Sequence, residues 1–508
     1  MTAYVHTGRG ITLALAMALA LAGCAVNRPP ASPSILSSTP PEWYAAKVKP
    51  DASATADAVN KTPASSDLPN DIRLSQLTNW WQLQNDALLL DLIQAAQNAS
   101  PSLLTALANI TQARANTSIA QAALLPTLDA SVSTSRSLAG PINRAAAAPA
   151  SLQQLGLQTS WEIDVFGRAS ANRDAASERL LGAGARWHAA RVSVAAEAAS
   201  QYYQLRSCES QLRIAQADTR SREQTSALAG LAAKAGFESP ANAALARAGA
   251  AESRARSTLQ RGQCEQGIKA LVALTAMPEP ELREKLAQAP LPPPQQALLA
   301  PDSLPAQVIS QRPDVFNAAR EVAASSFEVA NARAERYPQL SLSGSISRNK
   351  TFTRNQGLDF STWSVGPLSL NVPLFDGGAN QAHIASARAR YEDAASLYRG
   401  TVRQAVQEVE QALVMLQSSA DRNDDAALAA LGFETFFDAT EARQRAGLAS
   451  LVDLEDARRS LLNAQAAVAS LALERRKAWI ALYRALGGGW SSASAMPAAM
   501  TFQDLVSP

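Results

Sequence analysis

Strict alternation of apolar and polar side chains occurs in four short stretches, two in each half of the chain. The apolar positions are Leu128, Ala130 and Val132; Leu155, Leu157, Trp161, Ile163 and Val165; Leu340, Leu342 and Ile346; and Leu368, Leu370, Val372 and Leu374. A period of two with one apolar and one polar face predicts half-buried β-strands. The pattern fits a soluble sheet packed on helices, and it also fits strands that turn an apolar face to lipid. Four strands are too few to close a membrane barrel, so in the second case several chains must share one.

Two unusually long helices are predicted between these strands. From Gly167 to Gly236, and again from Gly378 to Gly447, the chain advances 69 residues without a proline and is rich in Ala, Leu, Arg, Glu and Gln. At 1.5 Å per residue, each rod is up to roughly 100 Å long and must pack against other helices, as in a coiled coil. Four shorter helical stretches are predicted to pack beside the rods: about 239–277, 450–487, 86–124 and 314–336.

The two halves of the chain resemble each other. Three pairs of landmarks recur in one order: ALLPTLDASVSTS (122–134) and ERYPQLSLSGSIS (335–347), WEIDVFG (161–167) and NVPLFDG (371–377), KAGFES (234–239) and RAGLAS (445–450). Their offsets are 212, 209 and 211 residues, measured at the shared Pro, Phe and Gly. This regularity predicts two repeats, 71–288 and 306–490, with a Pro-rich joint at 289–305 and a C-terminal tail at 491–508.

The N-terminus indicates export and a lipid anchor. The apolar run 11–22 is shorter than the ~20 residues of a membrane helix but suits the core of a signal peptide. It ends in Leu-Ala-Gly-Cys, which resembles the lipobox of bacterial lipoproteins, so 1–23 would be removed and Cys24 would carry lipid. The alternative is an ordinary signal peptide with a chance cysteine. Ala25, in place of an aspartate, favours the outer membrane, and residues 24–70, rich in Pro, Ser and Ala, are predicted to be an extended tether.

Composition and charge exclude several classes of function. Of 508 residues 47% are hydrophobic, so the chain is not disordered, and a net charge of +2 gives no reason to expect nucleic acid. The three histidines have no metal-ligand spacing, and the glycine-containing segment GAGARW (182–187) lies inside a predicted rod. No nucleophile motif or phosphate loop is found. We therefore expect no enzymatic activity and no cofactor or metal.

Cysteine positions predict a disulfide. Cys208 and Cys264 each lie 28 residues from Gly236, so folding the chain back at that glycine brings them within about a helical turn of each other. In an oxidising periplasm such a pair is expected to form a disulfide. Two buried free thiols are the alternative.

Four motifs together resemble one family. They are WSVGPLSLNVPLFDGG (363–378), QRPD (311–314), the hairpin at Gly447 and ALGGGW (485–490). With the lipobox they resemble the TolC-like outer membrane factors, specifically the lipoprotein branch that serves resistance-nodulation-division efflux pumps.

The resemblance implies a fold that is mainly α with membrane β. A homotrimer would form one 12-stranded β-barrel, with four strands per chain, continued by a long α-helical periplasmic barrel with a belt near the joint. The partners would be a periplasmic adaptor, an inner-membrane pump and outer membrane lipid. The implied function is a passive exit duct for drugs or other small toxic compounds. A duct for type I protein secretion and a structural coiled-coil lipoprotein are the alternatives.

The first candidate site is the pair of hairpin tips. Gly236 and Gly447 can adopt the left-handed conformation that ends a helix, and Ser239, Ser450 and Pro240 suit the start of the next one. By the resemblance, such tips dock the adaptor, which makes these residues docking candidates: Ala235, Gly236, Phe237, Ala446, Gly447 and Leu448. Helix-turn-helix geometry alone also explains the Gly and Ser residues.

The second candidate site is a gate. Asp453 and Asp456 lie three residues apart on one helix face, where the resemblance implies an acidic ring at the closed periplasmic end. A capping box between Ser450 and Asp453 is the alternative. The first hairpin has Ala243 at the matching position, and Ala449 stands where some family members have a latching arginine. The sequence therefore leaves open what holds the gate shut.

Overall fold

A computed structural model describes residues 27–31, 39–45, 80–138, 149–290, 309–353 and 356–490. The predicted signal peptide, Cys24, most of the Pro-rich joint and the C-terminal tail lie outside these residues. The chain divides into two compact units. We call Met1–Ser34, Ala108–Gly184 and Asn317–Arg399 the sheet unit, and Ile35–Leu107, Ala185–Phe316 and Gly400–Pro508 the hairpin unit.

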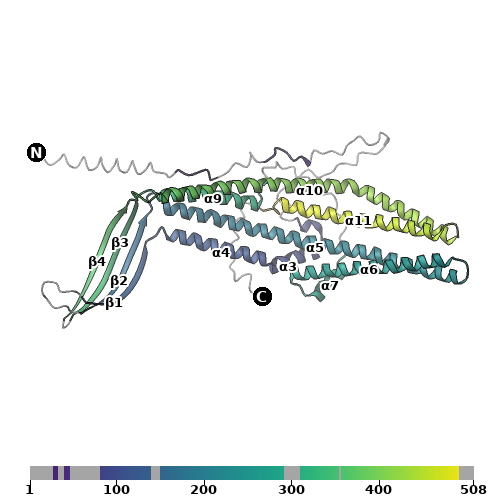
Figure 1. The fold of residues 1–508 in the computed structure, drawn as a ribbon, viewed down its shortest axis with the longest axis horizontal. Helices are drawn as coiled ribbons and strands as arrows, with labels where there is room; N and C mark the ends of the chain where they lie inside the picture. The colour runs from purple at the N-terminus through teal and green to yellow at the C-terminus, as the bar shows by residue number, and fades with distance from the viewer. Residues whose placement is uncertain are drawn as a thin grey trace. The chain divides into compact units, whose positions relative to one another are not determined.

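The sheet unit contains one antiparallel sheet of four strands in the order β1-β2-β3-β4 (Figure 1). The strands are β1 (Thr127–Leu138), β2 (Pro149–Ile163), β3 (Gln339–Thr353) and β4 (Gln356–Asn371). All four predicted strands are confirmed, and each extends farther from the helices than the alternation indicated. A register shift interrupts the β3–β4 pairing between Leu342 and Gly344.

Two predicted strands end earlier than the alternation suggested. Val165 lies beyond β2, and Val372 and Leu374 lie beyond β4. The reason is local capping by an aspartate. The Asp164 carboxylate accepts hydrogen bonds from the backbone of the following helix, and the Asp376 carboxylate does the same after β4. These bonds commit the backbone to a helix start, so the strand pairing stops.

The two faces of the sheet differ in polarity. Paired residues share a face, and one row across the strands is Ala130, Leu157, Ile346 and Trp363, whereas the adjacent row is Asp129, Gln158, Ser345 and Ser364. On the polar face, hydroxyl groups bond across β3 and β4, at 3.0 Å for Ser345–Ser364 and 2.8 Å for Ser347–Thr362. On the apolar face, Trp363 is 76% exposed and Val132 is 81% exposed. An uncovered apolar face of this kind requires lipid or protein against it.

Helices make up most of the described chain. They are α3 (Ala87–Ala99), α4 (Pro101–Ala122), α5 (Arg168–Lys234), α6 (Pro240–Thr275), α7 (Glu279–Gln288), α9 (Pro313–Ala334), α10 (Ala379–Arg445) and α11 (Leu451–Ala485), with a 3-10 turn, η2 (Gln82–Gln84). The two long rods are confirmed as α5 and α10, each of 67 residues. No helix among the described residues is both long enough and apolar enough to cross a membrane.

Two helical features differ from the expectation. The predicted run 86–124 is broken at Ser100, whose ψ of 117° is extended because Pro101 follows and disfavours a helical residue before it. The short helix α7 was not foreseen. Its C-terminal carbonyls, those of Leu286 and Ala289, accept hydrogen bonds from the buried Arg206 on α5, which explains why so short a helix is held in place.

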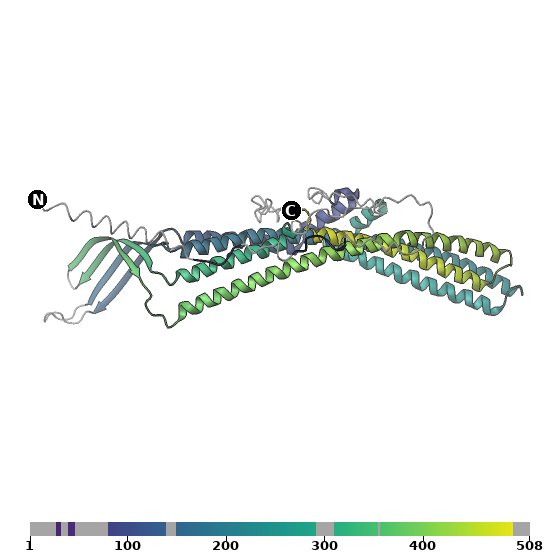
Figure 2. The same cartoon turned by 90° about the horizontal axis from the view of Figure 1, so that it is seen from above.

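The hairpin unit contains two helical hairpins, in which the C-terminal parts of α5 and α10 run antiparallel to α6 and α11 and lie beside them in both views (Figure 1, Figure 2). Small side chains dominate the buried positions of α5 in this unit, for example Ala195, Ala196, Ala198 and Ala199. Such residues allow helix axes to approach closely. Leu451 and Leu454 of α11 form a buried cluster with Ala246 of α6, so the two hairpins also pack on each other.

The QRPD and ALGGGW motifs meet in the hairpin unit. The buried Arg312 donates to the Ala485 carbonyl at 2.9 Å and pairs with Asp314 and Glu408 at 2.7 and 2.8 Å. Gly487 has a φ of +79°, and a Cβ there would lie 3.2 Å from the Arg312 Cα. The arginine and the glycine are therefore both needed for one close contact between the ends of the second repeat.

Candidate functional site

The two hairpin tips have the same backbone geometry. Gly236 and Gly447 adopt φ of +80° and +74°, the left-handed conformation that was predicted. The amide of the next residue bonds back over the helix end, from Phe237 to the Ala232 carbonyl at 2.9 Å and from Leu448 to the Arg443 carbonyl at 2.8 Å. A turn closed by this hydrogen bond, with a left-handed glycine, is the Schellman motif. Phe237 is 88% exposed and Leu448 70% exposed, so each tip presents one large apolar side chain to its surroundings.

The returning helices are capped by serine. Ser239 accepts a hydrogen bond from the Asn242 amide, and Ser450 accepts one from the Asp453 amide, both at 3.1 Å. Pro240 is the first residue of α6, where its missing N–H costs nothing. Local chemistry therefore accounts for the Gly, Ser and Pro residues of both tips. It does not account for the exposed Phe237 and Leu448.

Asp453 completes a capping box. Its carboxylate accepts from the Ser450 amide at 2.9 Å and from the Ser450 hydroxyl at 2.7 Å. These hydrogen bonds lower the pKa of Asp453, so the carboxylate is ionised at neutral pH. Asp456 lies one turn farther along α11 and pairs with Arg459 at 3.3 Å. Both carboxylates are exposed, that of Asp453 within the cap and that of Asp456 beside Arg459.

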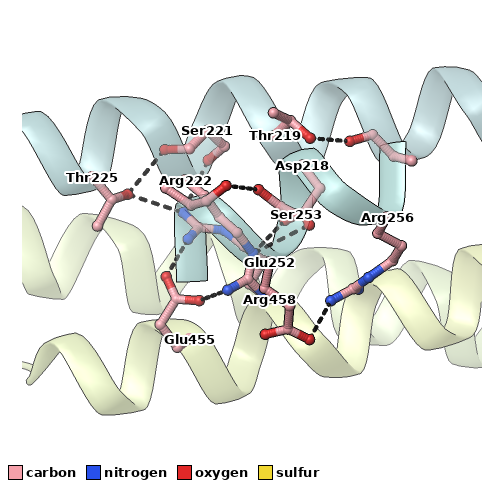
Figure 3. Close-up of polar contacts among 12 residues, drawn as sticks. Asp218, Thr219, Ser221, Arg222, Thr225, Glu252, Ser253, Arg256, Glu455 and Arg458 are labelled. Carbon is pink, nitrogen blue, oxygen red and sulfur yellow. Dashed lines mark hydrogen bonds and ion pairs between the residues drawn. The ribbon is translucent and has the colours of Figure 1, made fainter. Parts of the chain in front are cut away.

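A buried ionic network joins α5 to α11 beside these aspartates. Figure 3 shows Arg222 and Arg458 pointing toward Glu455 between the helices. Arg222 pairs with Asp218 at 3.0 Å and with Glu455 at 2.5 Å, and Arg458 pairs with Glu455. Arg458 also donates to the Ser221 hydroxyl at 2.9 Å and to the Thr225 hydroxyl at 3.3 Å.

Burial makes this network costly to break by removal of one partner. The side chains of Asp218 and Arg458 are each 3% exposed, Arg222 is 10% exposed and Glu455 is 14% exposed. Burial lowers the pKa of Arg458, and the charge of Glu455 opposes that shift. Two cations and two anions balance, so removal of any one leaves a buried charge without its partner.

Sequence reasoning missed this network. Asp218 and Arg222, and likewise Glu455 and Arg458, have the spacing of ordinary helix-surface pairs. That spacing does not show that the two pairs, more than two hundred residues apart in the sequence, pack on each other. Asp218 and Arg222 lie 18 and 14 residues before Gly236, whereas Glu455 and Arg458 lie 8 and 11 residues after Gly447, so no shared spacing from the tips marks the two pairs.

The structure links Cys208 and Cys264 by a disulfide, with the Cα atoms 5.6 Å apart. The bond ties α5 to α6, in the register that folding at Gly236 predicts. Among the residues that the structure describes, no group of three or more His, Cys, Asp or Glu side chains has the geometry to hold a metal ion.

Comparison with known families gives two matches along this chain. The family described as outer membrane efflux protein matches residues 92–277 and again residues 304–488. The second match begins 212 residues after the first, which agrees with the offsets of the internal repeat.

Individual relatives and a solved structure are similar over most of the chain. Outer membrane protein OprJ of Pseudomonas aeruginosa is 31% identical over 425 residues, covering 81% of this chain and 86% of that protein. The solvent efflux pump outer membrane protein SrpC of Pseudomonas putida is 27% identical over 415 residues, covering 80% of this chain and 86% of that protein. The structure of the outer-membrane channel OprN is similar with a TM-score of 0.76 at 27% identity, covering 87% of this chain and 99% of that chain.

Proposed function

The chain belongs to the outer membrane efflux protein family, and from that premise we propose that it is the exit duct of a tripartite efflux pump. Proteins of this family are outer membrane channels and not enzymes. The duct supplies a path, and an inner-membrane pump of the resistance-nodulation-division type supplies the energy. A periplasmic adaptor couples the two.

The observation that carries this proposal is the two-faced sheet. One face is apolar and uncovered, and the other carries serine, threonine and glutamine side chains. This arrangement suits strands with lipid on one side and water on the other. In the described sheet, β1 and β4 each leave one edge unpaired, and open edges are not tolerated in lipid. Three chains that join β1 to β4 would close a barrel of twelve strands.

The hairpin tips support adaptor docking. Phe237 and Leu448 are exposed at the ends of turns whose geometry is complete without them. Apolar side chains at two matching tips suit a partner that binds both hairpins in the same way. We assign Ala235, Gly236, Phe237, Ala446, Gly447 and Leu448 to this contact.

The region after the second tip supports a gate of two layers. Asp453 and Asp456 carry exposed negative charge, and threefold symmetry would assemble six carboxylates around the axis. Behind them, the network of Arg222, Glu455 and Arg458 holds α11 to α5 within one chain. Ala449 stands where some family members have a latching arginine, and alanine cannot form an ion pair. We therefore assign the role of the latch to this network.

The lipobox supports a lipid on Cys24, and thus an anchor in the outer membrane in addition to the strands. A single acyl chain gives only marginal attachment by itself, so the strands would supply the rest. The relatives include a solvent efflux protein, and small apolar compounds are the cargo class that we propose.

An export assay tests the function. Cells that lack the chain, but keep its adaptor and pump, should accumulate an apolar fluorescent dye, and the restored chain should reverse the accumulation. For the gate, Asp453→Ala with Asp456→Ala should raise the single-channel conductance and abolish block by cations. Unchanged conductance and unchanged block by cations would show that the aspartates have only a local role, in the cap and on the surface of α11.

A further inference from the structure

The apolar face of the sheet ends in a group of charged side chains. Beyond the row that contains Trp363, the next paired rows on this face contain Arg348, then Lys350 with Asp359, and then Arg136. All four charged side chains are exposed, and they lie at the ends of the strands that point away from α9 (Figure 1). We call these four residues the charged cluster. Charge on a face that is proposed to meet lipid requires a physical reason.

The spacing along β3 gives the depth of the charged cluster. The first row of the apolar face pairs Leu340 with Leu370, at the helix end of the sheet. Lys350 follows Leu340 by ten residues. Ten residues span about 34 Å along a strand, or roughly 26 Å in height at the tilt of strands in membrane barrels. Because the apolar band of such barrels is about 25 Å tall, Arg348 and Lys350 would lie at its far edge, at the level of lipid headgroups.

Positive charge exceeds negative charge in the charged cluster. Arg348 holds the Asp359 carboxylate with two hydrogen bonds, of 3.0 Å from Nε and 2.9 Å from Nη2. Lys350 lies 3.6 Å from the same carboxylate. Arg136 adds a third cation on this face. In the described part of the face, three cations therefore share one carboxylate, and the cluster should attract an anion.

The donors of the charged cluster suit a phosphate group. A guanidinium has five N–H donors, and the Asp359 carboxylate occupies two of those of Arg348. The Arg348 side chain is 65% exposed and that of Lys350 is 49% exposed, so both can reach a ligand on the apolar face. Alternate residues of a strand lie about 7 Å apart on one face, so both cations can contact one headgroup.

A hollow on the apolar face adjoins the charged cluster. It has a volume of about 420 Å³, and its lining includes Leu157, Ile346 and Trp363. Gly344 also lines it, and the absence of a side chain there deepens the hollow. Arg348 lies only one row beyond Ile346 on the same face. A cationic group beside an apolar hollow fits an amphiphile with an anionic head better than a free anion.

We propose that Arg136, Arg348 and Lys350 bind the phosphate groups of an anionic lipid of the outer leaflet, whose acyl chains lie in the hollow below them. The inference rests on the proposed function, in which the helices extend into the periplasm and the far ends of the strands face the exterior. The outer leaflet of bacterial outer membranes contains phosphorylated glycolipid, so lipopolysaccharide is the probe of this chemistry. The charged cluster then fixes the depth of the sheet by a specific headgroup contact.

Binding of labelled lipopolysaccharide to the purified full-length protein in non-ionic detergent tests the proposal. Arg348→Gln with Lys350→Gln should weaken binding roughly 30-fold, about fivefold for each cation lost. The matched control is Arg114→Gln with Arg388→Gln, which removes two exposed arginines from α4 and α10, outside the strands. This control should leave the affinity for lipopolysaccharide unchanged. Equal losses in the two double variants would overturn the site, because net charge alone would then explain them.

Asp359→Asn separates lipid binding from bracing of the sheet. If the charged cluster only fastens β3 to β4, loss of either partner of the Arg348–Asp359 pair should have the same effect. If it binds phosphate, Asp359→Asn should tighten binding of lipopolysaccharide severalfold, because the competing carboxylate is removed. An affinity that does not rise in this variant would mean that the cluster is an internal brace, and would overturn the proposal.

Dephosphorylated lipopolysaccharide and inorganic phosphate identify the source of the bound phosphate. The dephosphorylated probe should bind the unmodified protein as weakly as the native probe binds the Arg348→Gln, Lys350→Gln variant. Inorganic phosphate in large excess should not displace the native probe, because free phosphate has no acyl chain to place in the hollow. Displacement by inorganic phosphate would overturn the assignment to a lipid.

Channel recording keeps this inference apart from the proposed function. Protein that conducts in a planar bilayer, but binds the native and dephosphorylated probes equally, would overturn the headgroup site alone. Protein that neither inserts nor conducts would overturn the membrane position of the sheet, and the depth of the charged cluster would lose its meaning with it.

Discussion

Glu455→Gln probes the proposed latch most directly. The Glu455 carboxylate faces Arg222 and Arg458, and glutamine keeps its shape without its charge. Within the network, the two guanidinium groups would then keep Asp218 as their remaining carboxylate. Breaking a buried ion pair costs about 3–5 kcal/mol. We take about 3 kcal/mol because the amide oxygen still accepts a hydrogen bond, and this corresponds to a shift of about a hundredfold in an equilibrium.

If α5 and α11 separate at this point when the duct opens, the whole cost falls on the closed state. The open probability of single channels in a planar bilayer should then rise by about two orders of magnitude. A matched control is Glu223→Gln, which removes an exposed ion pair of α5 with Arg254. Exposed pairs contribute about 0.2–1 kcal/mol, so this control should change the open probability by about fivefold at most.

Two results would refute the latch. In the first, Glu455→Gln and Glu223→Gln change the open probability equally. In the second, Glu455→Gln lowers the melting temperature but leaves the open probability unchanged, which would mean that the network stays intact in the open state. Arg458→Met adds a consistency check, since its effect combined with Glu455→Gln should be smaller than the sum of the two single effects.

Three further predictions concern local features of the hairpin unit. Gly447→Ala should destabilise the second hairpin by about 1 kcal/mol or more, because Gly447 has a positive φ. Gly432→Ala, inside α10 with open space around its Cβ position, should instead stabilise the hairpin by about 1 kcal/mol. Thermal unfolding of the two variants measures both effects. Hydrogen bonds lower the pKa of the Asp453 carboxyl from 3.8, so the stability that the cap contributes should be fully present above pH 3.8. This contribution should be lost only as pH falls through the lowered pKa. An NMR titration that gives the Asp453 carboxyl a pKa at or above 3.8 would contradict this. Non-reducing peptide mapping of exported protein should recover Cys208 and Cys264 in one linked peptide, and alkylation of either thiol without reduction would refute the pairing.

The sequence predicted the hairpins well because their signals are local. Gly447 needs only its own left-handed φ, and Ser450 needs only the amide three residues ahead. The strands were predicted because their signal is also local: alternation of apolar and polar residues within one strand shows which face is apolar. The break before Pro101 was not predicted, although proline restricts the residue before it and so gave a local signal.

The remaining features depend on partners far away in the chain. Arg458 is an ordinary surface arginine by spacing, and only the packing of α11 on α5 buries it with Arg222. The contacts of residues 27–31 with α9 and α10 escaped prediction because a Pro-rich segment has the composition of a linker, and these contacts use backbone carbonyls that no pattern of side chains reveals. The ends of β2 and β4 were set by helix caps, which compete with alternation for the same residues.

The proposed function requires this chain to form a conducting duct through the outer membrane. Single-channel recording of the purified full-length protein in a planar bilayer tests it most directly. We predict discrete conductance steps, rare in the unmodified protein and frequent in the Glu455→Gln variant. Protein that inserts into the bilayer and conducts nothing in either form would contradict it.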